Sequence, residues 1–160
     1  MTDSAKERIT IVAPLTRVFD VISDFDRYPE WAPDIKATTV LARDEEGRAI
    51  EVEYRAAAMG RSVSVHLRYD YRGAPERLSW ELIGSDTVKR YDGTYVLVAT
   101  EADAEAGQGG PATEVEYELT VELLVPLPGF VKRRAEHRIV KAAMPELKTY
   151  IESGAADRTA

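Results

Sequence analysis

Alternation of apolar and polar residues over most of the chain is the feature that most restricts its fold. The pattern begins at Ile35 and continues to Leu123, interrupted by polar turns such as residues 44–47. Successive side chains of a strand point to opposite faces of a sheet, so the pattern predicts about six consecutive strands. Strands joined by short turns pair as an antiparallel meander that buries one face and exposes the other. The buried face needs a cover from elsewhere in the chain.

Upstream of this region, the sequence predicts one strand followed by short helices. Residues 6–12 alternate weakly, and Pro14 then stands at the first position of a helical pattern. The apolar positions of that helix are Leu15, Val18, Phe19, Ile22 and Phe25. Pro29 and Pro33, on either side of Trp31, predict a tight and partly helical link into the sheet.

The longest helical pattern runs from Pro128 to Glu152 and predicts an amphipathic helix that covers the sheet. Its apolar face consists of Val131, Ala135, Ile139, Ala142, Ala143, Leu147 and Tyr150. The alanines permit either close packing of the helix on the sheet or an apolar cavity between them. We expect the cavity, because a strongly twisted sheet curls around a helix. Pro145 removes a backbone donor and predicts a kink near residues 141–144.

Composition restricts the class of protein. With 160 residues, the chain can bury one continuous core, so we expect a single domain over residues 1–153 and a disordered tail over 154–160. A net charge of -7 argues against nucleic-acid binding, which requires clustered lysine and arginine. The sequence has no cysteine, no apolar signal at its start and no apolar run of the ~20 residues that a membrane span requires. We therefore expect a cytoplasmic protein without disulfide bonds.

Residues suited to catalysis or metal binding are few. The two histidines, His66 and His137, are in phase with polar neighbours, and no spacing typical of a zinc site or a phosphate-binding loop occurs. The glutamates of residues 114–122 repeat at every second position, which is typical of a solvated sheet face. The sequence therefore predicts no catalytic residue, no metal and no cofactor.

Aromatic residues dominate the predicted inward face of the sheet. They are Tyr54, Tyr69, Tyr71, Trp80, Tyr91, Tyr95 and Tyr117. Each offers an apolar ring, and each tyrosine adds a hydroxyl that can donate and accept hydrogen bonds. Such residues either fill the core or line a ligand cavity, and we take all seven as candidate ligand-binding residues.

The segment APLTRVFDVISDFDRYPEWAPDI, residues 13–35, closely resembles the opening signature of the START-like (SRPBCC) superfamily. The resemblance runs nearly end to end. Gly93-Thr94-Tyr95, Thr113-Glu114-Val115 and the segments PLPGFVKRR and LKTYIE resemble its polyketide cyclase/dehydrase and coenzyme Q-binding branches. It implies an α+β helix-grip fold, with two short helices after the first strand. In that fold a curved antiparallel sheet wraps around a long C-terminal helix over a hydrophobic cavity.

The resemblance also implies where a ligand enters, since it places Tyr28 and Trp31 near the mouth of the cavity. The apolar helix face adds Ile139, Ala142 and Ala143 as candidate ligand-binding residues. Arg138 lies at the border of this face and Glu146 falls within it on an ideal wheel, so either side chain could grip a polar ligand head.

One departure from the polyketide cyclases of this fold concerns the pocket itself. These enzymes typically place an arginine and several indoles there. In this chain Arg68 and Arg72 are out of phase with the inward residues, and Gly93 stands where a bulky aromatic residue is often found. The departure puts cyclase chemistry in doubt.

Three functions therefore follow from the sequence. The first, which we prefer, is a non-enzymatic carrier of a hydrophobic small molecule such as a lipid, an isoprenoid quinone or a polyketide. The second is a polyketide aromatase/cyclase whose tyrosines position a polyketone chain and polarise its carbonyls. The third is a closed module whose surface binds a protein partner.

An apolar tip with a basic flank precedes the long helix. Leu127 and Phe130 lie beside Lys132, Arg133 and Arg134. This combination is typical either of weak contact with an anionic membrane or of a capped helix start with solvated charges.

Overall fold

The N-terminal part of the protein forms a strand and two short helices, as the sequence predicts. In the computed structural model, β1 (Ser4–Ile11) is followed by α1 (Leu15–Ile22) and by the 3-10 helix η1 (Phe25–Glu30). Pro14 is the N-cap of α1, so this helix begins one residue later than predicted. The structure describes residues 4–58, 61–102, 110–124, 141 and 143–157.

Strands β2 (Ile35–Arg43), β3 (Ala49–Ala58) and β4 (Arg61–Asp70) form successive hairpins where the sequence alternates. The pairing of β2 with β3 shifts in register at three places, and the pairing of β4 with the next strand shifts between His66 and Leu67. Such bulges bend a strand and increase its twist. They account for the curl of this half of the sheet.

Strands β5 (Arg77–Ser85), β6 (Val88–Ala102) and β7 (Gly110–Leu123) complete a sheet of seven antiparallel strands. The strand order is β1-β7-β6-β5-β4-β3-β2, so the N-terminal strand pairs with the last one. Between β2 and β7 every strand pairs with its neighbour in sequence, which is the predicted meander.

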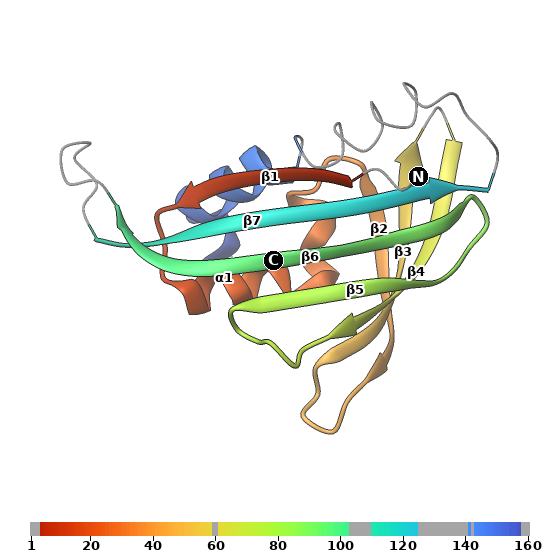
Figure 1. Ribbon diagram of the computed structural model, residues 1–160, viewed down its shortest axis with the longest axis horizontal. Helices are drawn as coiled ribbons and strands as arrows, with labels where there is room; N and C mark the ends of the chain where they lie inside the picture. Colours follow the sequence, from red (N-terminus) through yellow and green to blue (C-terminus); the bar gives the residue numbers. More distant parts are fainter. Residues whose placement is uncertain (1–3, 59–60, 103–109, 125–140, 142, 158–160) are drawn as a thin grey trace.

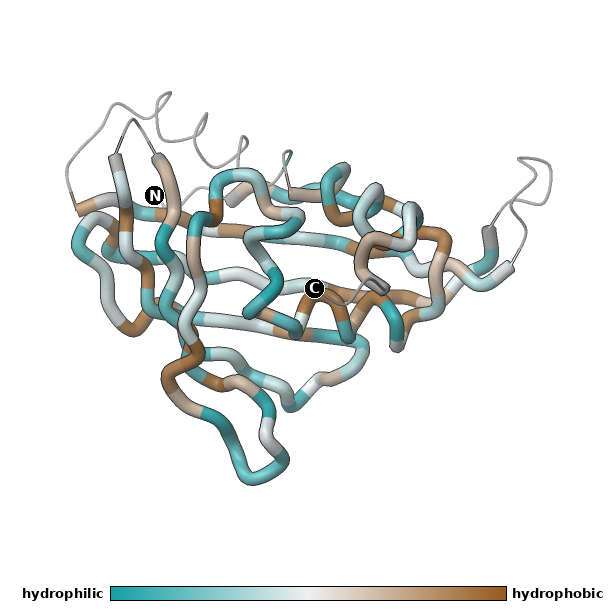
Figure 2. The backbone as a smooth tube through the Cα atoms, turned by 180° about the vertical axis from the view of Figure 1, so that it is seen from behind, coloured by the Kyte–Doolittle hydropathy of each residue, from teal (hydrophilic) through white to brown (hydrophobic). Residues whose placement is uncertain are grey.

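Helices cover one face of this sheet. In Figure 1, α1 and the C-terminal helical segment, residues 141 and 143–152, lie on the same side of strands β1, β7 and β6. Figure 2 views the protein from that side. The arrangement is the helix-grip fold that the sequence resemblance implies, with a curved sheet on one side and the C-terminal helix on the other.

The core lies between the sheet and these helices. Val18 and Ile22 of α1 and Leu147 of the C-terminal helix are fully buried, as are Leu78 of β5 and Leu119 of β7. The other side of the sheet is charged. There the glutamates of β7 pair with β1 side chains, as the predicted solvated face requires.

Part of the expected disordered tail is ordered. Residues Ala155–Asp157 form the 3-10 helix η3, and Ala156 is buried. The cause is a long-range contact, because Arg27 Nη1 of η1 donates a hydrogen bond to the Ala156 carbonyl at 2.7 Å. The prediction of disorder is thus wrong for residues 155–157, and residues 158–160 lie outside the described part of the chain.

Candidate ligand-binding site

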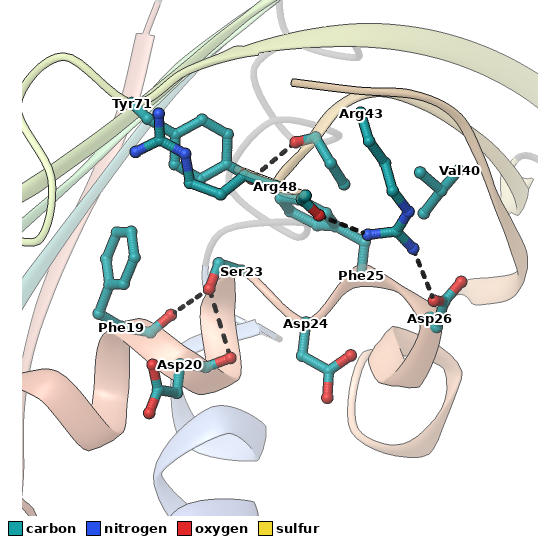
Figure 3. A pocket seen from close by; sticks show the side chains of 12 residues that line it. Phe19, Asp20, Ser23, Asp24, Phe25, Asp26, Val40, Arg43, Arg48 and Tyr71 are labelled. Carbon is teal, nitrogen blue, oxygen red and sulfur yellow. Dashed lines mark hydrogen bonds and ion pairs between the residues drawn. The ribbon is translucent and has the colours of Figure 1, made fainter. Parts of the chain in front are cut away.

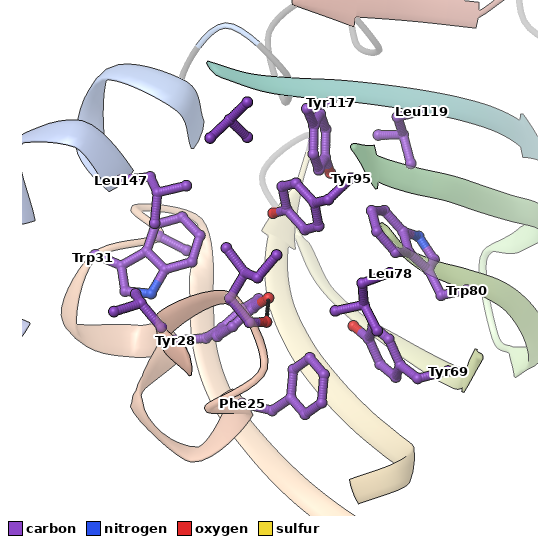
Figure 4. Close-up of a cluster of buried hydrophobic side chains, with 14 of the residues drawn as sticks. Phe25, Tyr28, Trp31, Tyr69, Leu78, Trp80, Tyr95, Tyr117, Leu119 and Leu147 are labelled. Atoms are coloured by element: carbon purple, nitrogen blue, oxygen red, sulfur yellow. Dashed lines mark hydrogen bonds between the residues drawn. The ribbon is translucent and has the colours of Figure 1, made fainter. Parts of the chain in front are cut away.

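Six of the eight tyrosines project into the space between the sheet and the helices. We call them the tyrosine cluster: Tyr28, Tyr54, Tyr69, Tyr91, Tyr95 and Tyr117. Five of them come from β3, β4, β6 and β7, where strand alternation directs them to the helical side, and Tyr28 comes from η1. Tyr95 and Tyr117 are directly opposite each other in the ladder, with ring centroids 4.8 Å apart. Figure 4 shows Tyr28 on the helical side of the core and Tyr69, Tyr95 and Tyr117 on the sheet side.

Hydrogen bonds fix three hydroxyls of the cluster. Those of Tyr54 and Tyr69 are bonded to each other, and the Tyr28 hydroxyl donates to the Ile22 carbonyl. Buried polar groups require such partners. The interior is therefore mainly apolar, with polar groups at defined positions.

Burial keeps these phenols neutral. It raises the pKa of Tyr91 to about 12 and raises those of Tyr28, Tyr54, Tyr69 and Tyr117 well above the ordinary value. The cause is loss of solvation, which disfavours the charged phenolate. Each hydroxyl thus retains its proton and can donate it in a hydrogen bond.

The two tryptophans flank the cluster and carry unused donors. Trp31 and Trp80 are buried, and neither indole Nε1 has a hydrogen-bond partner within the described part of the chain. Trp80 of β5 lies on Gly93 of β6, where an added Cβ would stand 2.2 Å from Trp80 Cζ2. The space above Gly93 is thus filled by an aromatic ring from the neighbouring strand.

Tyr71 does not join the cluster, although it shares the inward phase of β4. It follows the last residue of that strand, and its hydroxyl donates to the Ala49 carbonyl at 2.6 Å. It lines a different pocket of about 270 Å³, between α1, η1 and the turn from β2 to β3. Figure 3 shows this pocket, where Asp24 and Asp26 lie at the border and Arg43 Nη2 is 3.8 Å from Asp26 Oδ2. Arg48 lies over the Tyr71 ring, 4.8 Å from its centroid.

The described part of the C-terminal helix closes the core, as predicted. Leu147 and Tyr150 are buried and Ala143 is half-buried against the core. Glu146 is exposed, so its placement on the apolar face is wrong; the ideal wheel assumed an unperturbed helix around Pro145. The predicted residues that lie outside the described part are Arg138, Ile139, Ala142, Leu127, Phe130, Lys132, Arg133 and Arg134.

Charged groups are absent from the described interior. Among the described residues, the buried polar side chains apart from the aromatic ones are Thr113 and Thr120. His66 lies on the outer face of β4, half-buried, with Nε2 3.4 Å from Glu51 Oε1. Within the same ranges, no three histidine or acidic side chains are grouped as a metal site requires, and no helix is long and apolar enough to cross a membrane.

The sequence reasoning missed the part that Phe25 plays in the site. Its ring packs on Tyr69 at a centroid distance of 4.1 Å, and the same side chain lines the pocket beside Tyr71. Phe25 therefore separates that pocket from the tyrosine cluster. Phe25 follows Ile22 at helical spacing, which indicated that its side chain is buried. Such spacing gives no information about which strand the ring contacts.

Comparisons with known proteins agree with this geometry. A family model described as polyketide cyclase / dehydrase and lipid transport matches residues 2–152. Among solved structures, a START superfamily protein from Mycobacterium smegmatis is similar, with a TM-score of 0.83 at 22% identity, covering 94% of this chain and 97% of that chain. A protein from Thermus thermophilus gives 0.77 at 22% identity, covering 96% and 99% of the two chains.

The Zhui aromatase/cyclase from a Streptomyces species also gives a TM-score of 0.77, at 14% identity, covering 97% of this chain and 96% of that chain. At these identities the structural similarities show a shared fold. No curated protein matches the sequence.

Proposed function

Because this chain belongs to the polyketide cyclase/dehydrase and lipid transport family, we propose that it binds and carries a hydrophobic small molecule between its sheet and its C-terminal helix. A lipid, an isoprenoid quinone or a polyketide fits this class. The tyrosine cluster is the observation that carries the proposal. A core that only has to be stable is usually filled with aliphatic side chains, whereas six hydroxyls at one place suit a partly polar guest.

The proposed binding surface has two sides. The five strand tyrosines of the cluster form the sheet side together with Trp80, whereas Tyr28, Trp31 and Ala143 belong to the helical side. We propose that Arg138, Ile139 and Ala142 continue the helical side. Tyr71 is less directly involved, because Phe25 lies between its pocket and the cluster.

Native mass spectrometry of the gently purified protein, followed by organic extraction, tests the proposal. We expect a stoichiometric apolar passenger, or uptake of a fluorescent fatty-acid or quinone probe by the empty protein. A bulky side chain in the site should prevent uptake, so Ala143→Trp should lose the probe. Thr149→Trp, at an exposed position of the same helix, is the matched control and should retain it. A folded protein that takes up neither probe contradicts the proposal.

The alternative function is a polyketide aromatase/cyclase, and the neutral state of the phenols favours it specifically. Protonated hydroxyls can polarise the carbonyls of a bound polyketone chain and hold it in a reactive conformation. Tyr→Phe substitutions in the cluster separate the two functions. They should abolish turnover by an enzyme, whereas a carrier should keep most of its affinity for an apolar ligand.

The proposal also includes the cellular location of the protein and its contact with membranes. We expect it to act in the cytoplasm and to meet membranes at most weakly, through Leu127, Phe130 and residues 132–134. Sedimentation with liposomes tests the contact. Binding that does not depend on anionic lipid would rule it out.

A further inference from the structure

The pocket between α1, η1 and the turn from β2 to β3 lies outside the tyrosine cluster and has aromatic walls. Phe25 forms the wall towards the cluster. Phe19 and Tyr71 also line the pocket, and their rings meet edge to face with centroids 6.4 Å apart. A volume of about 270 Å³ is slightly below that of pockets for drug-sized ligands. The pocket therefore suits a small molecule with one ring and a short chain.

The acidic side chains of this pocket are only partly compensated by basic ones. Asp20, Asp24 and Asp26 line it. Arg43 Nη2 stands 3.8 Å from Asp26 Oδ2, whereas no basic side chain of the described residues forms an ion pair with Asp20 or Asp24. Partial loss of solvation raises the pKa of Asp24, although the nearby charge of Arg27 opposes the rise. The pocket thus holds carboxylates that lack an adjacent cation.

The two arginines that line the same pocket are engaged elsewhere. Arg48 Nε donates to Asp44 Oδ2 at 2.8 Å, and its guanidinium lies over the Tyr71 ring. Arg43 Nη1 donates to the Gly47 carbonyl at 3.0 Å. An incoming anion would compete with these partners, whereas an incoming cation would meet carboxylates without one.

We propose that this pocket is a second ligand site, which binds a small arylalkylamine with its ring against Phe19 and Phe25 and its ammonium group at Asp20 and Asp24. The inference is independent of the proposed function, because the tyrosine cluster takes no part in this site. The net charge of -7 also favours the approach of cations.

The selection follows from the combination of apolar walls and uncompensated charge. A ring that enters the pocket leaves water, which favours the binding of any ligand of this shape. An ammonium group is attracted in addition by the two carboxylates, whereas a carboxylate is repelled by them. Salt screens charges at a surface, so the preference for the cation should shrink as ionic strength rises.

Three probes of similar shape test the inference: 3-phenylpropylamine, 3-phenyl-1-propanol and 3-phenylpropionate. Binding to the full chain is followed by ¹H–¹⁵N spectra, in which the amides of Gly47 and Ala49 report on this pocket and the Trp80 indole reports on the tyrosine cluster. At low salt we expect the amine to bind about fivefold more tightly than the alcohol, and the carboxylate to bind most weakly. The amine should move the Gly47 and Ala49 signals and leave the Trp80 indole in place.

Asp20→Asn and Asp24→Asn each remove one charge from the site. Both side chains lie at the surface, so the variants should fold. Each should weaken binding of the amine about threefold and leave binding of the alcohol unchanged. Glu81→Gln is the matched control, because it removes the same charge at an exposed position of β5 outside the pocket. It should leave binding of the amine unchanged.

The opposite results would overturn the inference. Tightest binding of 3-phenylpropionate would mean that Arg43 and Arg48 determine the selection, and equal binding of amine and alcohol would mean that charge has no part in it. Equal weakening by Glu81→Gln would assign the preference to overall charge, and a shift confined to the Trp80 indole would place the amine in the tyrosine cluster. Failure of all three probes to bind would exclude the second site and leave the proposed function standing.

Discussion

Gly93 tolerates no side chain in this sheet, because the Trp80 ring occupies the space above it. An added Cβ would also stand 2.8 Å from the Glu118 carbonyl oxygen, so neither neighbour can move aside freely. We expect Gly93→Ala to lower the free energy of unfolding by about 1–3 kcal/mol, the usual cost of overpacking. Urea unfolding followed by circular dichroism measures the change.

Gly84→Ala is the matched control for this substitution. Gly84 is also a strand glycine, in β5, but an added Cβ there would contact nothing within 4 Å. The unfolding free energy of this variant should stay close to that of the unsubstituted protein. Equal destabilisation by both substitutions would show that the Trp80 contact is not the cause.

The buried phenols make stability depend on alkaline pH. For Tyr91, burial raises the folded pKa from 10.0 to about 12, so above pH 10 the unfolded chain loses a proton that the folded protein retains. The free energy of unfolding must therefore fall as pH rises from 10 towards 12, by up to about 1.4 kcal/mol per pH unit for each such phenol.

Urea unfolding at several pH values in this window measures the dependence. Tyr117, whose pKa burial also raises, offers the comparison: Tyr117→Phe removes one titrating phenol and should make the slope shallower. An unchanged slope would contradict the assignment of the effect to the cluster.

At the scale of single residues, the sequence predicted which aromatic side chains face inward, and it did not predict their partners. Alternation fixes the face of Trp80 but not the absence of an acceptor for its Nε1, because that depends on three-dimensional neighbours. Tyr71 shows the same limit. It lies one residue beyond the end of β4, so its side chain follows the alternation of the strand but contacts residues other than those of the tyrosine cluster.

The C-terminal helix is held to η1 by a cluster around Arg27, and this contact should set how tightly the helix stays closed. Arg27 donates to Glu30 and to the Ala156 carbonyl, and the Tyr150 hydroxyl donates to Glu30 Oε1 at 2.9 Å. We expect Arg27→Gln to increase amide hydrogen exchange several-fold in residues 143–152, because local opening becomes easier. Mass spectrometry of peptic fragments measures it.

Arg72→Gln is the control, because Arg72 pairs with Asp70 at the surface, at the end of β4. It should leave the exchange of the helix unchanged. Equal exchange in the Arg27 variant and the unsubstituted protein would mean that other contacts, such as the hydrogen bond from Lys148 to the Thr10 carbonyl, hold the helix.

At the scale of elements, the alternation of apolar residues predicted the strands, and the apolar spacing predicted α1. The sequence did not predict the 3-10 helix at residues 155–157, because this helix depends on a side chain 129 residues away in sequence. A polar and small-residue tail without local periodicity is typical of disorder, and only the fold brings Arg27 to it.

For the whole molecule, ligand binding should appear as added stability. A ligand at one hundred times its dissociation constant adds about 2.7 kcal/mol if it binds only the folded state. In a protein of this size that raises the melting temperature by about 5–10 °C. Differential scanning calorimetry with the fatty-acid or quinone probe measures the shift, and Ala143→Trp should abolish it. A bound ligand that produces no shift would mean that the unfolded chain binds it equally well, which would contradict a site that the fold creates.

At the scale of the whole molecule, the apolar periodicity alone did not predict the curvature of the sheet. It was expected from the general twist of sheets and from resemblance, whereas in the structure register shifts mark where the strands bend. Apolar periodicity gives no sign of a bulge, since one extra residue leaves the composition unchanged.

These register shifts have a second consequence, for association between copies of the protein. The strand order leaves β2 at one edge of the sheet, where unpaired backbone groups can recruit another strand. Three irregularities within nine residues, at Ile35/Ala37, Val40/Ala42 and Ala42/Arg43, interrupt the straight row of donors and acceptors that such recruitment needs. Lys36 and Arg43 add positive charge to the same edge. The bends that shape the interior thus also make β2 a poor template for fibre-like assembly.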